Sequence, residues 1–513
     1  MTSSFETSGR LLARNTLFNL LGQPIPMAVV FLTIPLIVRK LGTERFGILT
    51  LVWLFVGYFS FADLGLGRAS TKFVAELLGK SEESRIPGLV WTALVFQILL
   101  GIVCSLALIA LTPYLTQRIL NIPPGLLTEA KNTFYLLSAL VPAELCSACF
   151  RGILEARQRF DLVNAVKVPS NSLNYILPAI GVVLGFGLPA IVLLLLIQRI
   201  ASAVLYLLLS FRVLPILQQR FSVDCSVVSR LFTYGGWVTI CNVVGLLIAS
   251  VDRFVIASLL SLSAVTYYVI PLSFIPALLL LSNSVQTALF PASSAMAATR
   301  KEELERVSAR ALKFVILAQG ALTVMVVVFA RDLLRLWVGE TFAGSESVLV
   351  LQILAVGAFV NSMAAIPSAL LYGLGRPEIV AKVFLLQLPF YSALAWLLTK
   401  QMGTVGTALA WAVRGGFEAS LFGLAAWKRL GLRPSTFAEC GLGRTAMALG
   451  GLSLGVSSAA VGLRGSKPAS VMATVGLIAL FAVIAWRFVL SISERDGIRA
   501  VLLRQKKETG APG

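Results

Sequence analysis

The sequence predicts an all-α integral membrane protein with about fourteen transmembrane helices. Of its 513 residues, 57% are apolar and 13% are charged, whereas a soluble domain carries about 25% charged residues. Apolar stretches recur along the chain at the length a spanning helix needs, which is about 20 residues. Basic residues gather in every second connection between these stretches. The three observations agree on a multi-pass protein of the membrane class.

The predicted spans cover most of the chain. Arg10 and Arg14 precede the first, and no small-residue cleavage site follows it, so it is interpreted as a retained span. The second span contains 33 residues, about 50 Å of helix against a hydrocarbon core of about 30 Å, so it must kink, tilt or protrude, and Gly65 and Gly67 are the expected break. The fourteen spans are 15–38, 46–78, 88–115, 131–153, 162–184, 188–211, 231–259, 264–296, 311–330, 347–374, 378–399, 403–427, 445–463 and 469–491.

The placement of charge orients these spans. With the N-terminus inside, inside segments hold 30 of the 43 Lys and Arg residues, outside segments hold ten, and three lie within spans. Cytoplasmic connections carry such an excess of basic residues. The bias predicts an even number of spans with both termini in the cytoplasm. The net charge of +19 is therefore assigned to membrane orientation, and no nucleic acid is expected as a partner.

An internal repeat divides the chain. Spans 1 and 2 have the order span, short outside turn, over-long span with a polar break, and spans 7 and 8 repeat it about 220 residues later. The polar stretch 283–286 is the expected counterpart of the break in span 2, and both copies start inside, as in parallel repeats. The predicted division is an N-lobe at 1–211, a cytoplasmic connection at 212–231, a C-lobe at 232–428, spans 13 and 14 at 429–491, and a basic tail at 492–513.

Composition excludes several kinds of chemistry. The chain contains no histidine, the commonest general base and metal ligand. Its six cysteines are scattered, and the pair Cys146 and Cys149 lies in an apolar helix, where it is interpreted as two small apolar residues. Neither a metal nor a cofactor is expected.

Charged residues inside the spans are the candidate site. Arg199 has eleven span residues on either side, and a charge near mid-membrane costs at least about 2.5–3.5 kcal/mol. Asp252 and Arg253 are adjacent in span 7 and point about 100° apart on a helix, so neither is simply the partner of the other. Arg414 and Glu418 are four residues apart on one helix face and are expected to pair, mainly as a structural element.

Other charges have two interpretations. Asp63 and Arg68 either anchor the cytoplasmic end of span 2 or line a polar cavity. Lys167 lies near the inner end of span 5, where its ammonium can snorkel to the interface. Glu144 in span 4 is either a helix-packing hydrogen bonder or a proton site.

The basic residues form a cationic set suited to an anionic substrate. Arginine binds phosphate oxygens in a fork and lysine neutralises them. The candidate substrate-binding residues are Arg68, Lys167, Arg199, Arg253 and the amide Asn283. The candidate residues for a coupling ion, with H⁺ and Na⁺ both open, are Asp63, Glu144, Asp252 and Glu418.

Several segments resemble one family of membrane proteins. They are Arg14, Asn15 and Asn19, LGTERFGILTL at 41–51, FADLGLGRASTKFVAE at 61–76, VDRFVIASLL at 251–260, Tyr267-Tyr268 and ALFPA at 288–292. In order and spacing the chain resembles the Wzx-type polysaccharide flippases of the multidrug/oligosaccharidyl-lipid/polysaccharide exporter superfamily.

The resemblance implies two six-helix pseudo-symmetric lobes around a central basic cavity, with two further C-terminal helices. It implies alternating access that moves undecaprenyl-diphosphate-linked oligosaccharide across the bacterial cytoplasmic membrane for surface polysaccharide biosynthesis. Membrane lipids, a polysaccharide polymerase and export machinery are the implied partners. The resemblance implies that Arg68 and Arg253 lie on spans that line the cavity, as in related flippases. The assignment of Arg199 and Lys167 to the substrate site follows from their charge and position within the spans, and not from the resemblance.

Two alternatives stay open. A multidrug exporter of the same fold would be favoured by an acidic residue in span 1, and the sequence has none there. An integral-membrane glycosyltransferase or polymerase needs a sizeable outside loop with catalytic residues, and the longest connections are about 20 residues. The chain is therefore expected to be a transporter and not an enzyme.

Overall fold

The computed structural model describes residues 24–61, 66–79, 82–157, 159–219, 222, 244–296, 301–374, 376–430, 441–462, 467–491 and 495. Within these ranges the chain is helical and has no strand. The main helices of the first half are α2 (Pro24–Leu41), α3 (Thr43–Phe61), α4 (Leu66–Gly79), α5 (Ile86–Tyr114), α6 (Leu127–Ala156), α7 (Phe160–Val183), α8 (Leu188–Val213) and α11 (Val251–Leu259). Those of the second half are α12 (Leu262–Leu272), α13 (Ile275–Met296), α14 (Lys301–Val328), α15 (Ala330–Trp337), α17 (Ser347–Ser362), α18 (Ala365–Gly373), α19 (Pro377–Leu430), α21 (Leu442–Gly462) and α22 (Lys467–Ile484).

The helices carry the apolar segments that the sequence predicts as spans. Six described helical segments are long and apolar enough to cross a membrane, and a seventh is added if α12 and α13 form one broken span. Helix α19 (Pro377–Leu430) consists of two helices. Gly403 separates them, because its backbone angles, φ 62° and ψ −142°, are not helical. The chain is a multi-pass membrane protein, and the total of fourteen spans stays a prediction.

The chain divides into two compact units. Unit 1 comprises Met1–Val269, Trp337–Thr341 and Leu388–Thr407, and unit 2 comprises Ile270–Leu336, Phe342–Gln387 and Ala408–Gly513. The predicted division into two six-helix lobes, a connection, a C-terminal pair and a tail stays a prediction.

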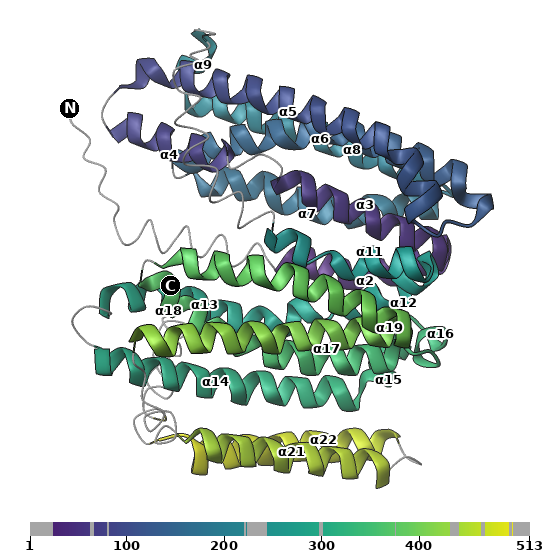
Figure 1. Cartoon of the computed structure of the whole chain (residues 1–513), viewed down its shortest axis with the longest axis vertical. Helices are drawn as coiled ribbons and strands as arrows, with labels where there is room; N and C mark the ends of the chain where they lie inside the picture. The colour runs from purple at the N-terminus through teal and green to yellow at the C-terminus, as the bar shows by residue number, and fades with distance from the viewer. Residues whose placement is uncertain are drawn as a thin grey trace, which may run out of the picture. The chain divides into compact units, whose positions relative to one another are not determined.

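In unit 1, α5, α6 and α8 lie side by side (Figure 1). Gly101 of α5 allows close packing, because a Cβ there would lie 2.8 Å from the Cα of Pro142 in α6. Cys149 is buried in the apolar cluster that these helices form with α4, and Cys146 packs against it. Both thiols therefore serve as apolar packing groups, as predicted.

In unit 2, α14 contacts α17 on one side and α21 on another, and α21 packs along α22. An apolar cluster joins Leu317 of α14 to Leu452 and Val456 of α21 and Phe481 of α22. Burial of apolar surface thus holds α21 and α22 against α14.

The two over-long spans are each built from two helices. The second span consists of α3 and α4, and Asp63 and Gly65 lie outside the described residues. The eighth span consists of α12 and α13, but its break lies at 273–274, so the predicted break at 283–286 is wrong. Pro271 in the last turn of α12 and Pro276 in the first turn of α13 explain the position, because proline removes a backbone donor and ends or starts a helix. Asn283 and Gln286 lie within continuous helix.

Candidate functional site

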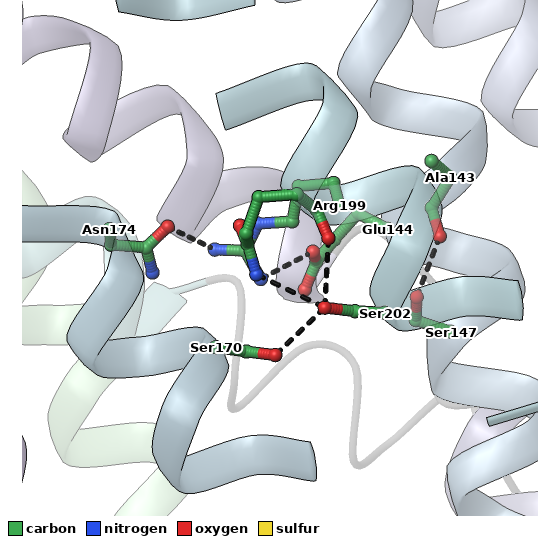
Figure 2. A network of polar contacts seen from close by, with 8 residues as sticks. Ala143, Glu144, Ser147, Ser170, Asn174, Arg199 and Ser202 are labelled. Carbon is green, nitrogen blue, oxygen red and sulfur yellow. Dashed lines mark hydrogen bonds and ion pairs between the residues drawn. The ribbon is translucent and has the colours of Figure 1, made fainter. Parts of the chain in front are cut away.

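A buried polar network surrounds Arg199 in unit 1 (Figure 2). Nη1 of Arg199 forms an ion pair with Oε2 of Glu144 at 3.0 Å, and its Nη2 donates to Oδ1 of Asn174 at 3.2 Å. The two charged side chains are only 12% and 11% exposed. The network therefore ties α6, α7 and α8 together through one guanidinium, and the carboxylate neutralises its charge.

Hydroxyl and amide groups extend the network along α7 and α8. Ser202 lies one turn after Gln198 on α8, and its Oγ accepts a hydrogen bond from Gln198 Nε2 at 3.1 Å. The same Oγ lies 2.8 Å from Oγ of Ser170 on α7. Small hydroxyl side chains let membrane helices approach closely and hydrogen-bond across the contact. We call Glu144, Ser170, Asn174, Gln198, Arg199 and Ser202 the Arg199 network.

A second charged group in unit 1 lies at the start of α11. Asp252 is 2% exposed, and its Oδ2 accepts a hydrogen bond from the hydroxyl of Tyr268 on α12 at 2.9 Å. Its Oδ1 accepts from the backbone N–H of Arg253 at 2.8 Å. Asp252 and Arg253 are thus linked through the backbone, and the side chain of Asp252 is directed to another helix, as expected for adjacent helical residues.

Helix α7 links the Arg199 network to α3. Asn174 accepts from Arg199 through its side chain, and its backbone carbonyl accepts from Nε1 of Trp53 on α3 at 3.2 Å. The ring of Tyr175, the next residue, lies 4.9 Å from the ring of Trp53.

Unit 2 contains a buried network of its own. Nη1 of Arg414 pairs with Oε2 of Glu418 at 2.9 Å, and their side chains are 10% and 14% exposed. The same carboxylate oxygen accepts from Gln387 Nε2 at 3.0 Å and from Asn361 Nδ2 at 3.4 Å. The guanidinium also lies over the ring of Trp411, 5.2 Å from its centroid. The predicted pairing of Arg414 with Glu418 is confirmed.

The structure places the other predicted residues differently. Lys167 and Asn283 are exposed, the first on α7 and the second on α13. Arg68 lies in α4, in a part of the helix where only the backbone is described, and Asp63 lies outside the described residues. Of the predicted set, Glu144 and Arg199 are brought together, and Asp252 and Arg253 remain neighbours. Whether any of them binds substrate or a coupling ion stays a prediction.

Sequence reasoning missed the amides that complete both networks. Asn174, Asn361 and Gln387 each lie inside an apolar helix, and a polar side chain there needs a hydrogen-bonding partner. Mid-helix amides in apolar spans are the signal that could have found them.

Arginine paired in a dry interior can bind an anion or hold helices together. In the described part of the chain no group of three His, Cys, Asp or Glu side chains could hold a metal ion. A cavity of about 620 Å³ lies between α21 and α22, and its lining is apolar apart from Arg444. None of the predicted site residues lines that cavity.

Solved structures with the same fold are transporters. The chain aligns with the lipid II flippase MurJ in an inward closed conformation with a TM-score of 0.70 and 12% identity, over 93% of this chain and 99% of that one. It also aligns with an inward-facing multidrug resistance MATE family transporter of the MOP superfamily with a TM-score of 0.68 and 16% identity, over 80% of this chain and 98% of that one. The chain therefore shares the fold of these two transporters.

The sequence defines the family more narrowly. Residues 12–297, more than half of the chain, match the family described as "Polysaccharide biosynthesis protein". The chain is also 26% identical over 408 residues to a protein of Shigella flexneri described as "Putative O-antigen transporter", covering 80% of this chain and 96% of that one. The chain belongs to the polysaccharide biosynthesis protein family, and the family predicted from its motifs is confirmed.

Proposed function

We propose that the protein flips undecaprenyl-diphosphate-linked oligosaccharide across the bacterial cytoplasmic membrane. The observation that carries this proposal is a buried, carboxylate-paired arginine, Arg199, within the region that matches the polysaccharide biosynthesis family. The similarity to an O-antigen transporter supports a glycan substrate, and the fold shared with a lipid II flippase supports a lipid-linked one.

The proposed mechanism is alternating access. The diphosphate-sugar head leaves water only where its charge is paired, because an unpaired charge in a dry interior is very costly. Arg68, Arg199 and Arg253 supply the pairing while the lipid tail stays in the bilayer. The proposed topology has fourteen spans, with both termini in the cytoplasm. H⁺ or Na⁺ bound at Asp63, Glu144, Asp252 or Glu418 is the proposed source of coupling, and the polymerase and export machinery are proposed partners.

A triple substitution tests the cationic site. In cells whose surface glycan depends on this chain, Arg68→Gln/Arg199→Gln/Arg253→Gln is expected to lower surface glycan at least about tenfold, since each hydrogen bond to a charged group contributes about 1.5–3 kcal/mol. Surface glycan is measured by lectin binding and divided by the amount of monodisperse protein in the membrane. A second version adds Glu144→Gln, so that no unpaired carboxylate prevents folding.

The matched control removes three exposed basic residues, Arg306→Gln/Arg310→Gln/Lys382→Gln, and changes net charge equally. Export should stay at the wild-type level in the control. Wild-type export in both versions of the site variant would show that these arginines do not form the substrate site.

The multidrug alternative predicts a different ligand. Its support is the fold shared with MATE transporters. A fluorescent organic cation should be expelled from cells expressing the chain if that alternative holds, and should accumulate as in control cells if the proposed function holds.

A further inference from the structure

Among the residues that the structure describes, each unit has a buried arginine network, and the two networks occupy corresponding positions in the sequence. Asn361, Gln387 and Arg414 of unit 2 follow Glu144, Asn174 and Arg199 of unit 1 by 217, 213 and 215 residues. These offsets match the spacing of about 220 residues seen between spans 1–2 and spans 7–8.

The supporting helices also correspond. In unit 1 the arginine is on α8, and its neighbours are on α6 and α7. In unit 2 the arginine is on the second helix of α19, and the network reaches α17 and the first helix of α19. By order among the predicted spans, these are the fourth, fifth and sixth helices of each half.

Packing contacts repeat with the same offset and do not depend on charge. Gly101 faces Pro142 between the third and fourth helices of the first half. Gly320 and Phe359, 219 and 217 residues later, form the corresponding contact, with a Cβ at Gly320 lying 3.3 Å from the ring of Phe359. Arg199 and Arg414 are therefore equivalent positions of one repeat.

The carboxylate that neutralises the arginine differs between the two units. In unit 1 it is Glu144, which lies on a different helix from Arg199 and separates from it if α6 and α8 move apart. In unit 2 it is Glu418, one turn after Arg414 on the same helix, so movement of one helix against another does not separate the pair. At the position of Glu144, unit 2 has the neutral Asn361.

We propose that, of the two network arginines, only Arg199 exchanges its carboxylate for a phosphate of the substrate, whereas Arg414 is a permanently neutralised positioning residue. This inference deepens the proposed function and rests on it. A guanidinium whose charge is balanced across a helix contact can be neutralised by either carboxylate or phosphate, so Arg199 is never left without a counter-charge. The displaced Glu144 carboxylate takes up a proton, in line with its proposed role in coupling, and so does not stay charged and unpaired. Arg414 does not exchange its carboxylate for a phosphate, and its network holds α17 and the two helices of α19 in place.

The proposal is tested by moving the carboxylate to another position, so that the acid is retained in each unit. Glu144→Gln/Ala203→Glu places the acid one turn after Arg199, which reproduces the unit 2 arrangement in unit 1. Glu418→Gln/Asn361→Glu places the acid on α17, which reproduces the unit 1 arrangement in unit 2. Ala203 and Glu418 are both half-buried, so the relocated acid has a comparable environment. Each double variant is compared with Glu144→Gln or Glu418→Gln alone.

Stabilisation of the detergent-purified protein by undecaprenyl diphosphate is the readout, with the neutral undecaprenol as the control lipid. The wild type and Glu418→Gln/Asn361→Glu are expected to gain at least about 3 °C in Tm with the diphosphate. At about 2.1 cal/mol/K of unfolding entropy per residue, this shift corresponds to roughly 3 kcal/mol. Glu144→Gln/Ala203→Glu should melt within about 2 °C of the wild type without lipid. It should gain clearly less Tm from the diphosphate than the wild type does, because Arg199 no longer contributes, and it should export at least about tenfold less glycan in cells.

Three outcomes overturn the proposal. They are a wild type that the diphosphate does not stabilise, a Glu144→Gln/Ala203→Glu variant that is stabilised like the wild type, and relocated variants that melt no higher than their single-substitution parents. Failure of the proposed function is distinguishable, because the Tm pattern would then hold while wild-type cells show no glycan export.

Discussion

Glu144→Ala is expected to destabilise unit 1 by about 3–5 kcal/mol, because it leaves the buried guanidinium of Arg199 without its counter-charge. The Arg199 side chain is only 12% exposed, so water does not replace the lost carboxylate. Thermal unfolding followed by tryptophan fluorescence measures the loss. Glu155→Ala is the matched control on the same helix, since its pair with Arg151 at 3.6 Å is about one-third exposed and such surface pairs contribute about 0–1 kcal/mol.

The apolar double variant separates stability from transport. Glu144→Leu/Arg199→Met should recover most of the lost stability, because replacing both members of a buried pair by apolar residues is often neutral or stabilising. Export should fall in the double variant, because Arg199 no longer supplies a charge for the phosphate. Equal stability of Glu144→Ala and wild type would contradict the buried ion pair, and normal export by the double variant would contradict its role in transport.

Gly47→Ala is expected to have the second large effect. A Cβ at Gly47 of α3 would collide with the backbone carbonyl of Leu262, the first residue of α12. A backbone atom cannot move aside as a side chain does, and overpacking of this kind costs about 1–3 kcal/mol or more. The Tm should fall, and the protein should lose activity in proportion to the unfolded fraction.

Gly57→Ala is the matched control ten residues further along the same helix. A Cβ at Gly57 meets no atom within 4 Å, so alanine should be neutral or stabilise by about 0.5–1 kcal/mol through its higher helix propensity. If both alanine variants melt at the same temperature, α3 and α12 do not approach each other as described.

The apolar helices that the structure describes were predictable because one physical signal dominates them. Spanning length, apolar composition and basic residues at alternate ends are all local properties of the chain. The pairing of Arg414 with Glu418 was predictable for the same reason, since four residues on a helix fix their separation. The predicted position of the break in span 8 was wrong because it was assigned to the polar stretch 283–286. Pro271 and Pro276 flank the observed break, and proline acts directly on the backbone.

The candidate site was predictable only as separate residues. Glu144 and Arg199 are 55 positions apart, and each was selected because a lone charge inside a span is costly. Their pairing depends on the rotation and packing of α6 and α8, which no local pattern determines. Lys167 shows that a charge within a predicted span does not by itself indicate a buried site. It shares α7 with Asn174 and Ser170 but is exposed.

The most direct test is transbilayer movement of a lipid-linked sugar by the purified protein. Liposomes containing the protein and undecaprenyl-diphosphate-linked N-acetylglucosamine are treated from outside with an impermeant galactosyltransferase, which labels only sugars of the outer leaflet. We expect the label to reach the lipid of both leaflets with the wild type, but only the outer leaflet's share with Glu144→Gln/Ala203→Glu or with empty liposomes. Labelling by the wild type that never exceeds the share seen in empty liposomes would contradict the proposal that this protein is a flippase for diphosphate-linked glycans.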